Sequence, residues 1–506
     1  MNNLNDIIST FSTENQQKFI TYLEKKNKRN DTKNIELFNL LLKNELSSKD
    51  VCAKLYGNQK KEAYHALRKR LHESLIDFTA NQSLQEENST NMQIIKYILA
   101  SKSFLQQKQY KVAYKILNRA EKLAVGQDLF PYLNEIYNIK IQYTYANPSV
   151  DMDALILKFK SNQKKILLED ELNIVYAKIR QTLKSISYHG EVLDFQTILA
   201  NTIKIHQIDL NDSMSFKSLY QLVTISSISA FITKDYLNIE PFLIDTYKSI
   251  ITYKNKEKQP YYHIQILYAI ANTLFRNKKF NASVSYLNLM HEHMNLNRKK
   301  HYNNFKLKYN LLKSLNYNYS NEQEKAIQTL EPLTKIKHQN TETLLDIRLS
   351  LIVFYFQKNN LNKAQNILSK LYHTDPWYTN KAGKEWVIKK NLIEILLHIE
   401  LQNINLVESK LLSFKRSYYT YLKSINQHRV ITYLGFVEMY YKNPRIVSTQ
   451  KFKDQVKNGF DWLETHKEDI FVISFYSWLK SKMNNTDLYQ TTLELIKQAQ
   501  KELTNP

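Results

Sequence analysis

Apolar residues recur at intervals of three or four positions along most of the chain, which is the spacing of one face of an α-helix. In the segment 60–81, for example, Leu67, Leu71, Leu75 and Phe78 form a single apolar stripe. The 506 residues include only 6 glycines and 8 prolines. Folds rich in strands and tight turns need many glycines, because those turns use positive φ angles. The pattern and the composition together predict an all-α fold.

A small residue flanked by larger apolar residues recurs inside these helical stretches. In the segment 101–125, Tyr110, Ala113, Leu117 and Ala120 follow the spacing Y-x2-A-x3-L-x2-A. This spacing resembles the tetratricopeptide (TPR) pattern, in which a small residue lets two antiparallel helices touch while larger residues fill the gap beside it. The resemblance implies a right-handed α-α superhelix, a TPR-like solenoid of helical hairpins.

The same register recurs downstream at a regular period. Clear examples are Tyr236-x2-Ile239-x3-Leu243, Phe280-x2-Ser283-x3-Leu287 and Leu361-x2-Ala364-x3-Leu368, and weaker centres are Ala154, Gln196, Ala326 and Ser409. Asp151 and Gln323 occupy positions where the pattern requires a large apolar residue. Counted from Ala113, successive centres lie 41, 42, 43, 44, 43, 38 and 45 residues apart, a mean of about 42. The usual TPR period is about 34 residues, so we expect longer helices; a HEAT-like array, with a period of roughly 40–47, is the alternative.

Composition divides the chain into four parts. Residues 1–81 form an N-terminal helical module, with helices expected near residues 3–11, 13–26, 32–43 and 60–81, and a short helix within residues 47–57 that serine caps and Gly57 stops. Residues 82–91 are polar and without periodicity, which is typical of a linker. Residues 92–423 carry the TPR-like hairpin repeats, and residues 424–506 carry C-terminal helical repeats and a cap. All four tryptophans lie beyond residue 376, so we expect a more individually shaped C-terminal region.

The N-terminal module contains a short helix, a turn at Gly57 and a basic helix that begins near residue 60. This order resembles a helix-turn-helix, in which the second helix enters the major groove of DNA. Lys60, Lys61, Arg68 and Lys69 are the candidate DNA contacts. The alternative interpretation is a helical cap that covers the apolar end of the repeat array.

Sequence signatures of catalysis and of cofactor binding are absent from the chain. The six glycines form neither G-x-G-x-x-G nor a P-loop, and no H-E-x-x-H occurs. His291 and His293 lie two residues apart, so on a helix they would point to different faces. The single cysteine, Cys52, excludes an internal disulfide and a cysteine-rich zinc site. We therefore expect no enzymatic activity, cofactor or metal; an enzyme in the tryptophan-rich C-terminal region is the least favoured class.

Positive charge is concentrated in one part of a basic chain. The net charge is +23, and residues 251–310 hold 11 Lys and Arg against 2 Asp and Glu. This stretch is either a solvated surface or an electropositive groove for an acidic peptide or a nucleic-acid backbone. By register, first helices of two successive hairpins would present cationic and amide donors to a carboxylate or an acidic peptide. The candidate partner-binding residues are Asn272, Arg276, Lys306, Lys308 and Asn310.

The N-terminus lacks the basic start and apolar run of a signal peptide, and no stretch approaches 18 uncharged apolar residues. We therefore expect a cytoplasmic protein without a membrane partner. The predicted function is a non-enzymatic adaptor or scaffold that binds a protein or peptide on the concave face of the solenoid. The alternative is a transcriptional regulator, with an N-terminal helix-turn-helix and peptide-sensing repeats, by analogy of architecture. The sequence leaves the oligomeric state open.

Overall fold

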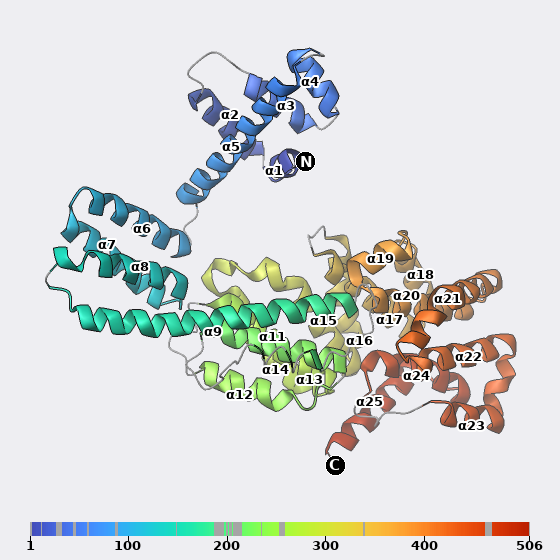
Figure 1. The fold of residues 1–506 in the computed structure, drawn as a ribbon. Helices are drawn as coiled ribbons and strands as arrows, with labels where there is room; N and C mark the ends of the chain where they lie inside the picture. Colours follow the sequence, from blue (N-terminus) through green and yellow to red (C-terminus); the bar gives the residue numbers. More distant parts are fainter. Residues whose placement is uncertain are drawn as a thin grey trace. The chain divides into compact units, whose positions relative to one another are not determined.

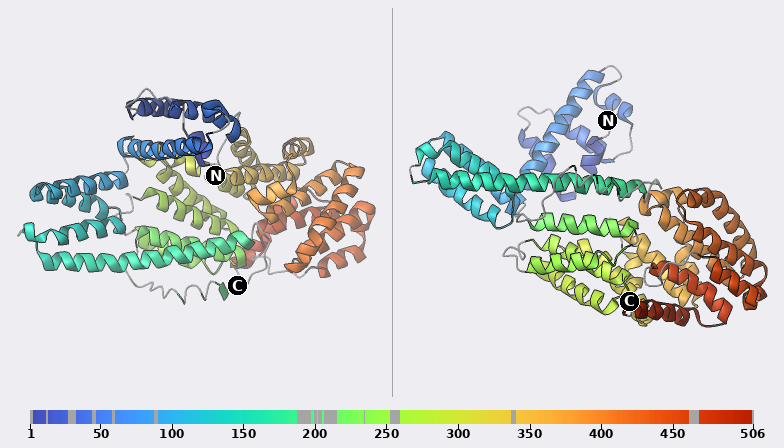
Figure 2. Two further views of the ribbon diagram at one scale, coloured as in Figure 1. Left: turned by 45° about the horizontal axis from the view of Figure 1, so that its top comes forward. Right: turned by 60° about the horizontal axis from the view of Figure 1, so that its bottom comes forward.

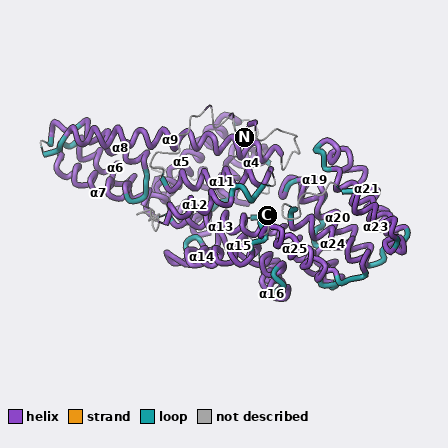
Figure 3. Tube along the Cα trace, turned by 90° about the horizontal axis from the view of Figure 1, so that it is seen from below, coloured by secondary structure: helices purple, strands orange, loops and turns teal. Residues whose placement is uncertain are grey.

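The structure of the chain is a computed structural model in which every element of the described residues is helical (Figures 1 and 3). This confirms the all-α prediction. The described residues are 3–11, 13–26, 33–43, 47–57, 60–86, 90–147, 149–186, 197–198, 201, 205, 215–233, 235–251, 259–336, 340–460 and 468–504. The chain divides into two compact units, Met1–Lys160 and Ser161–Pro506.

The helices of the first unit follow one another with short connections. They are α1 (Asn3–Ser9), α2 (Thr13–Lys26), α3 (Lys33–Lys43), α4 (Ser48–Tyr56), α5 (Lys61–Glu86), α6 (Thr90–Gln106), α7 (Tyr110–Val125), α8 (Phe130–Gln142) and the 3-10 helix η1 (Thr144–Ala146). The helix α9 (Met152–Lys184) crosses the boundary between the units. The described helices of the second unit begin with α11 (Phe216–Thr233) and α12 (Glu240–Ile251).

The remaining helices of the second unit pack largely as neighbouring pairs (Figure 2). They are α13 (Pro260–Arg276), α14 (Phe280–Lys299), α15 (Tyr302–Tyr319), α16 (Gln323–Leu330), η4 (Glu331–Lys335), α17 (Thr341–Gln357), α18 (Leu361–Leu368), α19 (Asp375–Ala382), α20 (Lys384–Glu400), α21 (Ile404–Ser424), α22 (His428–Lys442), η5 (Pro444–Ser448), α23 (Gln450–Asn458), α24 (Ile470–Asn484) and α25 (Leu488–Thr504). Among the described residues, no helix combines the length and the apolar character that crossing a membrane requires.

The N-terminal module builds a core of its own from residues between Leu4 and Phe78. The helix α4 starts at a capping box, in which Ser47 and Asp50 satisfy each other's free backbone donors. It ends at Gly57, whose φ of 72° favours glycine. The helix α5 continues to Glu86, five residues into the predicted linker, because nothing in residues 82–86 breaks a helix.

The same left-handed turn joins the two helices of successive hairpins. Between α13 and α14, Lys278 has φ of 61°, its N–H donates to Phe275 O at 2.9 Å, and Lys279 N–H donates to Leu274 O at 2.9 Å. This is a Schellman motif, which satisfies the free carbonyl groups at the end of a helix. The left-handed residues at the equivalent turns are Lys108, Asn321, Asn359 and Gln402.

A fully buried residue follows each of these left-handed residues by five positions. These residues are Ala113, Ser283, Ala326, Ala364 and Val407, each 0% exposed. Four of them are predicted centres of the repeat, so the packing role of the small residue is confirmed there. The predicted centre at Ser409 is wrong by two positions, because the helix α21 starts at Ile404 and Val407 occupies the contact. The corrected steps between the last four centres are 43, 38 and 43 residues (326 − 283, 364 − 326 and 407 − 364).

The predicted register does not hold between residues 125 and 250. Ala154 is exposed, and α9 runs on for 33 residues because no glycine or proline interrupts it. Gln196 lies outside the described residues. Ile239 precedes the first residue of α12, and Leu243 carries the buried contact instead. Gln323, the polar residue in an apolar position, is buried and donates to Asn318 Oδ1 at 3.3 Å.

The C-terminal helices pack on helices that lie far away in the sequence. Ile470, Ile473, Leu495 and Ile496 of α24 and α25 share one apolar cluster with α13, α14 and α15. A second cluster extends from α15 to α24 and includes the buried side chains of Trp386 and Trp478. The tryptophan-rich region is therefore part of the core of the second unit.

Candidate functional site

The five predicted partner-binding residues lie half-buried on two neighbouring helices, Asn272 and Arg276 on α13 and the rest on α15. Arg276 is already engaged within the chain, because its Nη1 forms an ion pair with Asp469, the residue before α24. Burial works against the charge of the guanidinium group, but the nearby Asp469 carboxylate keeps the pKa of Arg276 above its ordinary value. The charge of Arg276 is therefore already balanced within the chain, although its buried Nε makes no hydrogen bond with the described residues.

The other predicted residues differ in whether their side chains already make polar contacts within the chain. Asn310 Nδ2 donates to the backbone oxygen of Lys306 at 2.7 Å, within the same helix. The side chains of Asn272, Lys306 and Lys308 make no hydrogen bond or ion pair with other described residues. The Nζ of Lys308 lies 5.8 Å from the ring centroid of Tyr268, a cation–π distance. Three polar groups of the predicted set thus remain available to a partner.

The basic stretch 251–310 is not one electropositive surface. Lys278 is buried and donates to Glu468 O at 2.8 Å, and burial lowers the pKa of Lys278 to about 8. Lys279 forms an ion pair with Glu240 at 2.7 Å, and Arg276 is held by Asp469. The lysines among residues 252–258 lie outside the described residues. Charge counted along the sequence therefore overstates the charge that this part of the chain offers to a partner.

Lys308 belongs to a set of residues that recur at one register position in three successive hairpins. Lys308, Asp346 and Lys389 each lie 13 residues before the left-handed residue of their hairpin (321 − 308, 359 − 346 and 402 − 389). All three are half-buried, on the first helices α15, α17 and α20. We call this set the polar column. Its signs alternate from lysine to aspartate to lysine, and each lysine acts electrostatically on Asp346.

Asp346 is the most unusual member of the polar column. Its carboxylate makes no hydrogen bond or ion pair with other described residues. Burial and the neighbouring Glu342 raise the pKa of Asp346 to about 7, against the opposing effects of Lys389, Arg276 and Lys308. A partly buried acid with a pKa near neutral is a recognised mark of a functional position. The sequence pattern did not single it out, although its register relative to Lys308 was a signal that could have found it.

Lys389 connects the polar column to the C-terminal helices. Its Nζ forms an ion pair with Glu385 at 2.9 Å and lies 4.8 Å from the ring centroid of Phe471 in α24. Close by, Tyr319 OH and Ser474 Oγ are 3.0 Å apart, which ties α15 to α24. The start of α24 therefore borders the column, a position that no local pattern of the sequence indicates.

The four predicted DNA-contacting residues do not behave alike. Lys60, Lys61 and Lys69 are exposed at and near the start of α5. Arg68 is half-buried, and its Nη1 lies 3.3 Å from Ser48 Oγ and 3.4 Å from the hydroxyl of Tyr64. Arg68 therefore holds α5 against α4, and the other three residues make up the free basic face of this helix.

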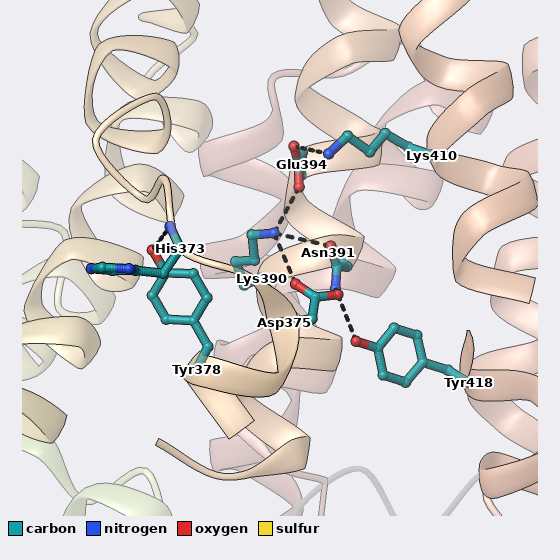
Figure 4. A network of polar contacts seen from close by, with 8 residues as sticks. All are labelled: His373, Asp375, Tyr378, Lys390, Asn391, Glu394, Lys410 and Tyr418. Carbon is teal, nitrogen blue, oxygen red and sulfur yellow. Dashed lines mark hydrogen bonds and ion pairs between the residues drawn. The ribbon is translucent and has the colours of Figure 1, made fainter. Parts of the chain in front are cut away.

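A second polar network lies among α19, α20 and α21 (Figure 4). Asp375 accepts hydrogen bonds from Tyr418 OH at 2.6 Å and Asn391 Nδ2 at 2.8 Å, and Lys390 Nζ lies 3.5 Å from its other oxygen. Burial disfavours the carboxylate, but these donors outweigh that effect and lower the pKa of Asp375. Lys390 continues the network to Glu394 at 3.1 Å. Opposite charges are thus paired throughout the network, which ties α19 to α20 and α21.

The two neighbouring histidines contact different parts of the chain. The ring of His291 stacks on Tyr309 with centroids 5.2 Å apart, and the ring of His293 lies 3.9 Å from that of His263. Within the described ranges, no three histidine, cysteine or acidic side chains are grouped to hold a metal ion.

No protein-family model matches this chain, and the comparison with curated proteins finds no relative. The likeness to helical-repeat proteins therefore depends on the hairpin geometry: all-helical structure, recurrent left-handed turns and buried small residues at one register position.

Proposed function

We propose that the helical hairpins form a TPR-like superhelix and that the protein is a non-enzymatic scaffold, which binds a protein or peptide segment along the polar column. The observation that carries this proposal is the recurrence of Lys308, Asp346 and Lys389 at one register position. Equivalent positions of successive repeats line one continuous surface of a solenoid, and such surfaces serve as extended binding faces.

The energetics of the column favour recognition of a segment with both polar and charged groups. Lys308 and Asp346 are partly removed from water, and neither makes an ion pair or a hydrogen bond with the described residues, which costs free energy. A bound segment that supplies a counter-charge or a backbone donor would recover that loss. Because the column alternates in sign, it fits a segment whose charges alternate in the opposite order, and this choice replaces the purely acidic partner predicted from the charge count.

The test is affinity capture with the full-length chain from a lysate of the cells that make it, with the bound proteins identified by mass spectrometry. The variant Lys308→Ala with Asp346→Ala should lose the specifically bound proteins. The matched control is Lys300→Ala with Asp170→Ala, which removes the same charges from exposed positions. If the column variant is folded by circular dichroism and still retains the same proteins, the column is not the binding face.

A second candidate function is duplex DNA binding by the N-terminal module. The observation that favours it is the module's own core, drawn from residues between Leu4 and Phe78. A cap would instead need to bury its apolar face against the first repeat. A self-sufficient core together with the exposed Lys60, Lys61 and Lys69 supports the helix-turn-helix alternative.

Binding of the full-length chain to duplex DNA at increasing salt tests this candidate. The triple change Lys60→Glu, Lys61→Glu and Lys69→Glu should abolish binding and its salt dependence, because phosphate contacts release counterions. The control reverses the same number of charges on the exposed face of α7, at Lys111, Lys115 and Arg119. An equal loss of DNA affinity in both variants would show that binding depends only on the net charge of the chain. If the parent chain does not bind duplex DNA even at low salt, the helix-turn-helix interpretation is wrong and the cap interpretation stands.

A further inference from the structure

We propose that Tyr372, His373 and Trp377 form a docking surface for a protein segment in which acidic residues stand next to apolar ones. We call these three residues the aromatic platform. They lie in the connection between α18 and α19 and in the first turn of α19. The platform is separate from the polar column and gives the scaffold a second recognition surface.

The platform is a stack of rings at the surface of the second unit. The rings of His373 and Trp377 are nearly parallel, with centroids 3.9 Å apart and an interplanar angle of 17°. Tyr372 extends the stack, with its centroid 4.5 Å from that of His373, and its side chain is 80% exposed. A tyrosine this exposed beside two other rings presents an apolar area with few rotatable bonds, which is the composition of binding hot spots.

Buried neighbours hold the platform in one geometry. The Tyr378 ring lies 5.1 Å from Trp377 and 5.3 Å from the buried Trp386, and its hydroxyl accepts a hydrogen bond from the His373 backbone N–H at 3.2 Å. Figure 4 shows His373 and Tyr378 beside the network that anchors Asp375 at the start of α19. Such prior ordering lowers the entropy that binding must overcome.

The charges around the platform select an acidic partner. Lys370 precedes it and Lys381 lies one helical turn after Trp377, and both are exposed and make no ion pair with other described residues. Arg348 acts electrostatically on Tyr378 and also lacks an ion pair in the described part of the chain. The one nearby acid in the segment, Asp375, is balanced by Lys390. The rim is therefore cationic, so it would repel a basic segment and attract an acidic one.

The same residue types occur in sites for single-stranded nucleic acid, but the ring geometry favours protein. Bases stack on free aromatic faces, one face for each base. Here His373 and Trp377 each cover one face of the other, and the Tyr372 and Tyr378 rings lie 4.5 Å from His373 and 5.1 Å from Trp377 at tilted and perpendicular angles. Rings packed on one another in this way do not form a row of parallel open faces for successive bases, and they suit an apolar side chain that packs beside them.

The experiment measures binding of fluorescently labelled probes to the full-length chain by anisotropy. The probes are a short peptide of alternating aspartate and phenylalanine, its lysine–phenylalanine and aspartate–serine counterparts, and an oligothymidylate of similar length. The aspartate–phenylalanine peptide should bind most tightly, and Tyr372→Ala should weaken it by at least about tenfold, the effect of losing a hot-spot aromatic. Lys370→Glu with Lys381→Glu should also weaken binding of the aspartate–phenylalanine peptide relative to the parent chain. This loss of affinity should grow as the salt concentration falls, because screening of the charges decreases.

Tyr145→Ala is the control, because Tyr145 is another surface tyrosine, 74% exposed and beside other rings. Because the Tyr372 side chain is 80% exposed, Tyr372→Ala should leave the fold unchanged, which circular dichroism checks. Unchanged peptide affinity in Tyr372→Ala, or equal affinity for the lysine–phenylalanine peptide, would overturn the proposal. Tighter binding of oligothymidylate that depends on Tyr372 would overturn it in favour of nucleic acid.

Discussion

Arg276 and Asp469 form an ion pair although 193 residues separate them in the chain. The side chains are 24% and 18% exposed, so water screens the pair only in part. Arg276 ends α13 and Asp469 caps the start of α24, where its side chain accepts from Phe471 N–H. The pair therefore joins the C-terminal helices to the first helix of a central hairpin.

Breaking this ion pair should cost more than breaking an exposed one. Asp469→Asn retains a good capping residue but leaves the guanidinium of Arg276 without its counter-charge. We expect the free energy of unfolding to fall by about 1–3 kcal/mol, measured by urea denaturation. The exposed pair of Asp245 and Lys248 is the control, and Asp245→Asn should cost no more than about 0.5 kcal/mol. Equal losses would mean that the long-range pair adds nothing to stability.

The buried small residue of the first clear repeat unit should not tolerate a larger side chain. Ala113 is 0% exposed, whereas its neighbour Val112 is 42% exposed on the same helix. Ala113→Phe should overpack the helix contact and lower the free energy of unfolding by about 1–3 kcal/mol. Val112→Phe places the same ring at the surface and should change it by less than about 0.5 kcal/mol. Similar stability of the two variants, by thermal or urea unfolding, would contradict the assigned register.

The raised pKa of Asp346 predicts a pH-dependent stability. The ordinary pKa of the carboxyl group is 3.8 and the folded value is about 7, so the folded chain retains a proton that the unfolded chain releases. The contribution of Asp346 to stability therefore falls as pH rises from about 4 to 7 and is constant above that range. Asp346→Asn should raise the melting temperature at pH 8 and change it little at pH 4.

The exposed Asp170→Asn serves as the reference for this measurement, because it removes a carboxylate from a solvated position. The difference in melting temperature between Asp346→Asn and the parent chain is the quantity to follow across the pH range. A difference that stays constant with pH would show that Asp346 titrates as an ordinary carboxylate does.

The hydroxyl of Tyr418 should contribute to the network under the aromatic platform. Tyr418→Phe removes the 2.6 Å hydrogen bond to Asp375 and keeps the ring. A hydrogen bond to a charged group contributes about 1.5–3 kcal/mol, so the free energy of unfolding should fall by an amount in that range. Tyr441→Phe is the comparison, since its hydroxyl makes only long contacts of 3.4 and 3.5 Å at the surface. If both variants unfold at the same urea concentration, the network does not stabilise α19.

Local features of the sequence determined the helices and the register of four of the eight predicted repeat centres. The apolar stripe of α5, the serine cap of α4 and the small residues at 113, 283, 326 and 364 are each decided by residues within one or two helical turns. The same locality explains the errors. The centre predicted at Ser409 lies two positions too late, because the turn before α21 sets where that helix starts. The helix α9 was not predicted at its full length, because no glycine or proline marks an end within it.

The tertiary structure alone decided which polar side chains are available. Arg276 looked like a partner-binding cation, and its engagement by Asp469 depends on chain segments that meet only after folding. Asp346 and Lys389 lie at the register position of Lys308 because the three first helices α15, α17 and α20 belong to successive hairpins. A single aspartate within one helix does not indicate this relationship. A contact between residues more than 150 positions apart produces no regular spacing in the sequence, since each residue follows only the local pattern of its own helix. The sequence by itself thus determined the helical hairpins, and the packing of those hairpins determined the surfaces that they present.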